Sequence, residues 1–165
     1  MRLLKLISFL LLTILAACFP DVISFEEQLE RDVELIDAYL AENNIEAMED
    51  ESGIRYVIHA FGSGIQPFPE EDCVELNYVG KVMATGNVFD ERENFAYPLR
   101  NMLVGLQIGI PFIAKGGSLT LYIPSVYCFG SYGDKGLNVP KNANLIFDID
   151  LLDVNSPNPD TGLCN

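Results

Sequence analysis

Three short segments that carry aromatic residues constrain the fold of this chain most. Val74–Gly80 alternates apolar with polar side chains, Phe89-Asp90 follows the next turn, and Leu145–Leu152 alternates Leu, Ile and Phe with Asp. Such alternation is typical of a β-strand with one buried face. No nucleophile, general base or set of metal ligands recurs among these segments. They therefore favour an apolar pocket over a covalent or proton-transfer site.

Local patterns predict the remaining secondary structure. Pro124–Pro140 is rich in Gly, Ser, Tyr and Asn, and its length suits either a functional loop or an ordinary surface loop. The sequence thus predicts an α+β fold with several antiparallel strands and one short internal helix. The predicted strands are 53–61, 73–83, the short 88–89, 118–123 and 144–154, and the helix is 101–109.

The N-terminus has the features of a bacterial lipoprotein leader. Residues 1–17 combine a short basic start with the apolar run Leu6–Leu15, which is too short to span a bilayer. The run ends in Leu-Ala-Ala followed by Cys18, which resembles a lipobox. We expect a lipid on Cys18 to anchor the protein to a membrane of the bacterial cell envelope, on the periplasmic or outer-membrane side. An ordinary secretory signal is the alternative.

A helix is predicted after Ser24. Ser24 and Glu27 have the spacing of a capping box, and an apolar stripe from Phe25 to Leu40 recurs at helical spacing. This helix can pack on its own domain, pair with a second copy, or hold the domain away from a membrane. We take packing on its own domain as the default. Residues 18–52 are thus a helical extension before the main domain.

Length and charge restrict the organisation and the partners. Residues 53–154 suit one domain, and the polar, proline-containing segment 155–165 is predicted to be a disordered tail. The formal net charge is −14, and it becomes more negative when Arg2 and Lys5 leave with the leader. This charge disfavours binding to nucleic acid and to anionic lipid headgroups.

The cysteines and the single histidine give no metal or catalytic signature. The cysteine spacings match no zinc pattern, so no metal and no cofactor is expected. We interpret Cys73 and Cys128 as small core or strand residues, with a disulfide as the alternative, and Cys164 as part of the tail. His59 lies in a predicted strand without a nucleophile nearby in sequence, which favours a structural role.

The motifs taken together resemble the FK506-binding-protein (FKBP) family of peptidyl-prolyl cis-trans isomerases. Their order and spacing match over residues 53–154, although no single motif would suffice. The matching residues are Tyr78-Val79-Gly80, Gly86, Phe89-Asp90, Gly105, Gly109, Gly116, Ile123-Pro124-Ser125, Phe129-Gly130, Val139-Pro140 and Leu145-Ile146-Phe147. Together with the leader, they resemble the lipoprotein branch of this family.

This resemblance implies a bent antiparallel sheet wrapped around the short helix, with a shallow aromatic pocket that receives a proline ring. It assigns catalytic positions to Tyr78, Phe89, Asp90 and Phe129, with Asp90 held against a tyrosine hydroxyl. It also assigns a set of substrate-binding positions, which are Phe95, Met102, Leu103, Leu106, Val139 and Phe147.

Two of these positions depart from the family pattern. The family usually has tryptophan as the pocket floor, where this chain, which lacks tryptophan, has Leu106. The family usually has tyrosine at Phe129, so a hydroxyl donor worth about 0.5 to 1.5 kcal/mol is missing. Tyr127 and Tyr132 are the candidates to replace that donor.

The expected function is peptidyl-prolyl isomerisation that assists the folding of exported proteins. The expected substrates are proline-containing or unfolded polypeptides. Two alternatives remain open. One is a catalytically weak or inactive binding module of the same fold, which Leu106 and Phe129 favour. The other is a structural accessory of an envelope complex that docks through its N-terminal helix.

Overall fold

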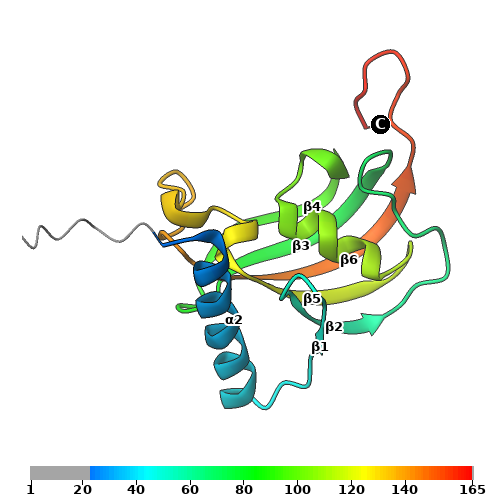
Figure 1. The fold of residues 1–165 in the computed structure, drawn as a ribbon. Helices are drawn as coiled ribbons and strands as arrows, with labels where there is room; N and C mark the ends of the chain where they lie inside the picture. The colour runs from blue at the N-terminus through cyan, green and yellow to red at the C-terminus, as the bar shows by residue number, and fades with distance from the viewer. Residues whose placement is uncertain (1–22, 165) are drawn as a thin grey trace, which may run out of the picture.

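A computed structural model describes residues 23–164, and in it six antiparallel strands form one bent sheet (Figure 1). The strand order is β1-β2-β5-β6-β3-β4. Strand β3 lies between β6 and β4 and pairs with both along most of its length. The elements are α2 (Phe25–Glu42), β1 (Met48–Glu49), β2 (Arg55–Ala60), β3 (Cys73–Val82), β4 (Val88–Pro98), α3 (Val104–Gly109), β5 (Ser118–Ile123) and β6 (Leu145–Asn155), with short 3-10 turns at Leu99–Asn101, Ile110–Phe112, Ser125–Tyr127 and Gly130–Tyr132.

The short helix α3 packs closely on one face of this sheet. Two of its residues are glycines, and a Cβ at Gly105 would lie 2.2 Å from Ile123 Cγ2, while one at Gly109 would lie 2.5 Å from Leu121 Cδ1. Any side chain at either position would push the helix away from β5. This face carries the main core, in which Leu121, Ile123 and Phe147 are buried. The sequence prediction of one internal helix wrapped by a bent antiparallel sheet is confirmed.

Helix α2 covers part of the opposite face. Ile36 and Leu40 of α2 form a second buried cluster with Met83, Tyr122 and Ile146. Tyr122 and Ile146 alternate along β5 and β6 with residues of the main core, so they point to the other side of the sheet. The Ser24 side chain accepts a hydrogen bond from the Glu27 backbone N–H at 3.1 Å and caps the helix, as the sequence predicts. The default expectation that α2 packs on its own domain is therefore confirmed.

A buried carboxylate joins α2 to the sheet. Asp32 is fully buried. Its Oδ2 accepts a 2.6 Å hydrogen bond from Ser125 Oγ, and its Oδ1 accepts one of 2.8 Å from Gln28 Nε2. The Asn144 side chain donates to the Asp32 carbonyl oxygen at 3.0 Å and accepts from the Ser125 backbone N–H at 3.0 Å. The apolar stripe thus includes one polar position, which fixes the helix to the loop after β5.

Strand β4 is much longer than the predicted Val88-Phe89. The charged and polar segment Asp90–Asn94 lies outside the predicted strand. In the structure β4 is an edge strand paired only with β3, so its charged side chains remain in contact with water. A bulge between Leu76 and Tyr78 accompanies this pairing, and Asn77 Oδ1 accepts a 2.9 Å hydrogen bond from the Asn94 N–H.

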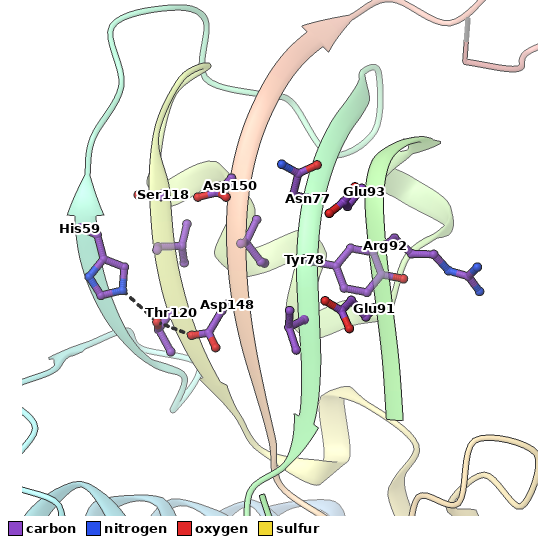
Figure 2. Close-up of a pocket in the computed structure, with 13 residues that line it drawn as sticks. His59, Asn77, Tyr78, Glu91, Arg92, Glu93, Ser118, Thr120, Asp148 and Asp150 are labelled. Atoms are coloured by element: carbon purple, nitrogen blue, oxygen red, sulfur yellow. Dashed lines mark hydrogen bonds between the residues drawn. The ribbon is translucent and has the colours of Figure 1, made fainter. Parts of the chain in front are cut away.

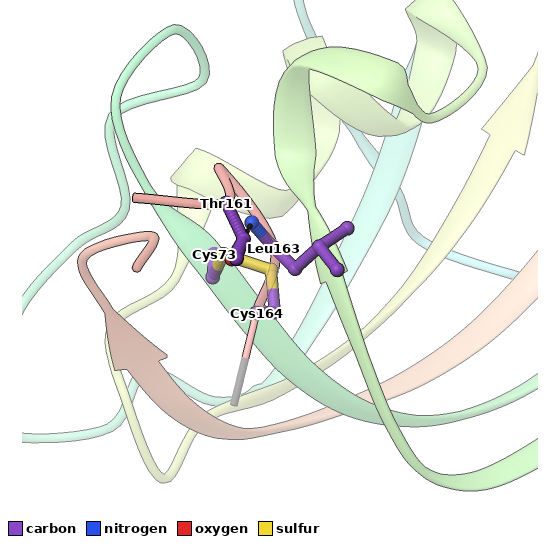
Figure 3. Close-up of a disulfide and its surroundings, with 4 residues drawn as sticks. All are labelled: Cys73, Thr161, Leu163 and Cys164. Atoms are coloured by element: carbon purple, nitrogen blue, oxygen red, sulfur yellow. Dashed lines mark hydrogen bonds between the residues drawn. A yellow bond between two sulfur atoms is a disulfide. The ribbon is translucent and has the colours of Figure 1, made fainter. Parts of the chain in front are cut away.

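The cysteine interpretation needs correction, because Cys73 forms a disulfide with Cys164 (Figure 3). Cys73 begins β3 and pairs with Asn155 at the end of β6, so the tail leaves the sheet next to Cys73. The predicted disordered tail instead has a defined path to residue 164, with a turn closed by the Leu163 carbonyl accepting from the Asn158 N–H at 2.9 Å. Linear sequence could not show that the tail returns to its own starting point.

Cys128 is the free cysteine of the described part of the chain. Burial, and then the nearby charge of Asp32, raise the pKa of its thiol above the ordinary value, which suits an unreactive core residue. The leader and the expected lipidation at Cys18 lie outside the described residues. Between residues 23 and 164, no helix is both long and apolar enough to cross a membrane.

Candidate functional site

The residues expected to form the proline pocket come together around one small cavity between the sheet, α3 and the loop after β5. Its volume is about 180 Å³. Nine of the ten predicted catalytic and substrate-binding residues line it. The lining consists of Tyr78, Phe89, Asp90, Phe95, Tyr97, Met102, Leu103, Leu106, Phe129, Leu137 and Phe147.

Six aromatic rings form a continuous series along this cavity. Phe89 lies edge-on to Phe147 and to Phe129, with centroid distances of 5.6 and 6.0 Å. Tyr78 contacts Phe147 at 6.0 Å and Phe95 at 5.9 Å, and Phe95 stacks on Tyr97 at 5.4 Å. Edge-to-face contacts of this kind add about 0.5 to 1.5 kcal/mol each beyond simple burial. The rings therefore hold one another in place and form a preformed apolar wall.

Gly80 makes room for this arrangement. A Cβ at Gly80 would lie 2.7 Å from Phe89 Cζ and 3.0 Å from Phe147 Cε1, so the two rings rest directly on the β3 backbone. This contact gives a physical reason for the glycine two residues after Tyr78 in the motif.

A carboxylate marks the polar side of the cavity. The Tyr78 hydroxyl donates a 2.5 Å hydrogen bond to Asp90 Oδ2, and Asp90 Oδ1 accepts from the Glu91 N–H at 3.1 Å and lies 3.2 Å from Arg92 Nε. Burial, then the hydrogen bond to Asp90 and its negative charge, raise the pKa of Tyr78 to about 12. The hydroxyl therefore stays protonated and remains a donor at neutral pH. The expected contact between Asp90 and a tyrosine hydroxyl is present.

The two departures from the family pattern both lie in the cavity wall. Leu106 is buried on α3 and lines the cavity, and Phe129 closes it from the loop side. Neither Tyr127 nor Tyr132 is among the lining residues. The Tyr127 ring packs on Phe25 with a centroid distance of 5.8 Å, and the Tyr132 side chain is 88 % exposed. Neither hydroxyl takes the place of the missing donor at Phe129.

Val139 is the predicted pocket residue that the structure places elsewhere. It is buried in the main core and does not line the cavity. Its N–H donates to the Asp134 carbonyl at 2.7 Å, and its carbonyl accepts from the Asp134 N–H at 2.9 Å. This pair closes the loop that presents Leu137 to the cavity, so Val139 shapes the wall indirectly.

Sequence reasoning missed Tyr97 and Leu137. Tyr97 belongs to the part of β4 that was not expected to be a strand, and Leu137 lies in the long loop, where no periodicity indicates which side chains face inward. A full-length β4, continued in alternation from Phe95, would have placed Tyr97 on the same side.

A larger groove of about 520 Å³ lies on the other face of the sheet, and its lining is polar (Figure 2). His59 Nε2 lies 2.9 Å from Thr120 Oγ1, which donates to Asp148 Oδ1 at 2.7 Å, while Lys81 Nζ donates to Asp148 Oδ2 at 2.7 Å. Figure 2 shows the first two of these contacts in a row across three strands. Tyr78 is the only predicted site residue that touches this groove, so we take the aromatic cavity as the candidate site.

The bent antiparallel sheet, the short helix against it and the aromatic cavity between them define an FKBP-like domain. A family model for the FKBP-type peptidyl-prolyl cis-trans isomerase matches residues 64–152, which is more than half of the chain. The chain belongs to this family.

Curated relatives and solved structures agree with this assignment. The chain is 30 % identical over 114 residues to the FKBP-type isomerase FkpA of Aeromonas hydrophila, covering 67 % of this chain and 41 % of the relative. It is 34 % identical over 107 residues to FkpA of Escherichia coli K12, covering 62 % of this chain and 38 % of the relative. The chain thus spans about two fifths of the length of these curated relatives.

The crystal structure of FkpA from Escherichia coli has a TM-score of 0.65 to this chain at 29 % identity, covering 79 % of this chain and 64 % of that one. A peptidyl-prolyl isomerase from Pseudomonas syringae has a TM-score of 0.66 at 24 % identity, covering 77 % and 96 %, which supports the fold.

Proposed function

We propose that this protein is a peptidyl-prolyl cis-trans isomerase that turns Xaa-Pro bonds in the aromatic cavity. The observation that carries the proposal is the preformed series of rings beside the Tyr78–Asp90 hydrogen bond. Membership of the family supports it.

The cavity suits a reaction that needs no nucleophile. Rotation about the Xaa-Pro bond is slow because its C–N bond has partial double-bond character, with a barrier of about 18 to 20 kcal/mol. An apolar wall that removes the imide from water disfavours the polar resonance form and so weakens the double bond. A site that fits the twisted bond better than either planar isomer then lowers the barrier by differential binding. A thousandfold acceleration requires only about 4 kcal/mol.

Each part of the wall has a role in this proposal. Phe89, Phe147 and Leu106 surround the proline ring. Asp90 is held by Tyr78 and Arg92, so its partial burial is compensated and its position is fixed. With Phe129 in place of tyrosine, one hydrogen bond to a ligand carbonyl is missing, and with Leu106 in place of tryptophan the floor is smaller. We infer weaker macrolide binding and lower turnover than the family pattern implies.

A proline-limited refolding assay and an Xaa-Pro peptide assay test the proposal. The folded protein should accelerate both reactions, and Phe89→Ala and Asp90→Leu should reduce the acceleration at least tenfold. Circular dichroism must show that each variant retains its fold. No acceleration by the folded wild-type protein would refute the enzymatic function.

That result would leave the second candidate function, a binding module of the same fold. The presence of Leu106 and Phe129 favours it, because these residues replace the family's usual tryptophan and tyrosine in the lining of a cavity that is still present. Binding of a proline-containing peptide without acceleration would support it.

We further infer that the protein acts on exported, unfolded or proline-containing polypeptides while attached to an envelope membrane through a lipid on Cys18. The leader and lipobox pattern support this inference. Replacing Cys18 with alanine should move the protein from the membrane fraction to the soluble fraction. Unchanged partitioning would reject the anchor without affecting the proposed activity.

A further inference from the structure

A second cavity lies next to the aromatic one, between the start of α2 and the loop after β5. Its volume is about 810 Å³. We call it the helix–loop groove. Its lining is formed by Ile23, Ser24, Phe25, Gln28, Val126, Cys128, Phe129, Gly130, Ser131, Tyr132, Lys141 and Asn142.

We propose that this groove binds the polypeptide segment that flanks the isomerised proline. The occupant we infer is an extended chain with an apolar or aromatic side chain a few residues from the proline. This inference rests on the proposed function and identifies how that site selects long substrates over short ones.

Phe129 connects the two cavities. It lines the helix–loop groove and also closes the aromatic cavity, where its ring lies edge-on to Phe89. A chain whose proline occupies the aromatic cavity therefore needs only to pass Phe129 to enter the groove. An extended chain advances about 3.3 Å per residue, so a residue a few positions from the proline can reach it.

The groove presents apolar surface that an isolated domain would not be expected to expose. Tyr132 is 88 % exposed and Phe25 is 50 % exposed, although both are aromatic. Exposed aromatic side chains grouped at a concave surface are typical of sites that bind other polypeptides. A single exposed tyrosine would carry no such meaning.

Charge also distinguishes the groove from the rest of the molecule. The chain has a formal net charge of −14, yet the only charged side chain in the groove lining is that of Lys141. Lys141 has no ion-pair partner among the salt bridges of residues 23–164. An acidic side chain or terminal carboxylate of the bound segment would find a cation here, whereas the remaining surface would repel it.

The two walls of the groove are fixed relative to each other before any ligand binds. Asp32 of α2 accepts the hydrogen bond from Ser125 Oγ, and Phe25 packs on Tyr127. A site with fixed walls loses less conformational freedom on binding than a mobile one. This arrangement gives α2 a role that the isolated FKBP-like domain lacks, because Ser24, Phe25 and Gln28 at the start of the helix line the groove.

Photo-crosslinking tests the location of the flanking segment directly. A proline-containing peptide that carries a benzoylphenylalanine four residues from the proline should label the fragments holding Phe25 or Tyr132 in the full chain. Labelling confined to other regions, such as the exposed Phe61 and Phe68 of the loop between β2 and β3, would overturn the proposal, as would labelling of the chain's own N-terminal segment alone. This readout does not require catalysis.

Variants test the energetic contribution of the groove. For Tyr132→Ala and Lys141→Glu, we expect the ratio of kcat/KM on a proline-limited protein to kcat/KM on a tetrapeptide to fall about fivefold. The matched controls are Phe68→Ala, another exposed aromatic residue, and Lys135→Glu, which makes the same charge change on the same loop outside both cavities. An unchanged ratio in both groove variants, or an equal fall in the controls, would overturn the proposal that the groove binds the flanking segment.

The proposed function and the groove can fail separately. A wild-type protein that accelerates neither substrate refutes isomerisation, while crosslinking to Phe25 or Tyr132 would still establish the groove. Conversely, normal catalysis with no crosslink to Phe25 or Tyr132 and an unchanged kcat/KM ratio in the groove variants refutes only the proposed role of the groove.

Discussion

Ser125 Oγ donates a 2.6 Å hydrogen bond to Oδ2 of Asp32, a carboxylate that has no solvent exposure. These residues are separated by 93 positions, and their contact joins the N-terminal helix to the loop that carries Phe129. Asp32→Asn should lower the free energy of unfolding by about 1 to 3 kcal/mol. The amide has one oxygen where the carboxylate has two, so either Ser125 Oγ or Gln28 Nε2 loses its acceptor. Urea denaturation measures the change. Glu30→Gln, an exposed neutralisation on the same helix, serves as the control, and an equal loss in both variants would contradict this role for Asp32.

The disulfide between Cys73 and Cys164 closes a loop with a sequence separation of 91. A cross-link of this span restricts the unfolded chain by about 4 to 5 kcal/mol in the chain-entropy model. Cys164→Ser should lower the thermal midpoint, and a reducing agent should lower the midpoint of the wild-type protein but not that of the variant. A wild-type midpoint that is insensitive to reduction would contradict the prediction.

The contacts of Asp148 should stabilise the fold near neutral pH and lose this effect in acid. Burial acts to raise its pKa, but the hydrogen bonds from Lys81 and Thr120 and the charges of Lys81 and His59 outweigh burial and lower the pKa below 3.8. Since the folded pKa lies below the unfolded one, the stabilisation is present above about pH 4 and is lost as the pH falls through the folded pKa. The difference in unfolding free energy between wild type and Asp148→Asn should therefore shrink as the pH falls from about 4 through the folded pKa. Lys81→Met should weaken the same pH dependence, and a difference that does not decrease at all as the pH falls below about 4 would argue against this account.

Gly80→Ala should disturb the aromatic wall, because the new methyl group would overlap Phe89 and Phe147. We expect a loss of stability of about 1 to 3 kcal/mol from overpacking and a fall in isomerase activity of at least tenfold. Gly86→Ala is the comparison variant. Gly86 has a positive φ of 71°, which Gly80 does not, and nothing lies within 4 Å of its would-be Cβ, so backbone strain there should cost stability without affecting activity. Equal activity in both variants would exclude a specific role for Gly80.

Phe129→Tyr restores the hydroxyl that the family usually has at this position. The added donor should raise macrolide affinity and peptide kcat/KM by about 2- to 10-fold, the equivalent of about 0.5 to 1.5 kcal/mol. Isothermal calorimetry and the peptide assay measure the two effects. Phe61→Tyr, an exposed change far along the chain, should leave both quantities unaltered, and no gain at position 129 would show that the hydroxyl is not the limiting feature.

Much of the fold follows from local patterns in the sequence. Alternation identified β3 and β6 closely, and the Ser24 cap and apolar stripe identified α2, because each of these elements has one face turned to the core. The strand β5 was identified by the glycines before it and the proline after it. The length of β4 could not be predicted in this way. Its charged residues are accommodated only because it lies at the edge of the sheet, and the position of a strand in a sheet is a property of the fold rather than of the segment.

The residues of the cavity were predictable through family resemblance more than through chemistry. Taken alone, Tyr78, Phe89 and Phe147 have the pattern of ordinary core residues, and only their shared cavity distinguishes them. Contacts between distant segments were out of reach. Asp32 lies among the residues of a predicted apolar stripe and Cys164 in a polar tail, and each depends on a partner that is distant in sequence, by 93 and 91 positions respectively.

The position of Ile23 determines which end of the chain is suitable for immobilising the protein on a surface. The first described residue forms part of the helix–loop groove, whereas the C-terminal residues lie at the far end of the sheet, beside Cys73 (Figure 1). A carrier, bead or sensor chip joined directly at Ile23 brings the helix–loop groove up against the attachment surface, with the aromatic cavity beside it. Coupling through the C-terminal end leaves them facing open solution, so the direction of immobilisation alone should alter how large a client can approach.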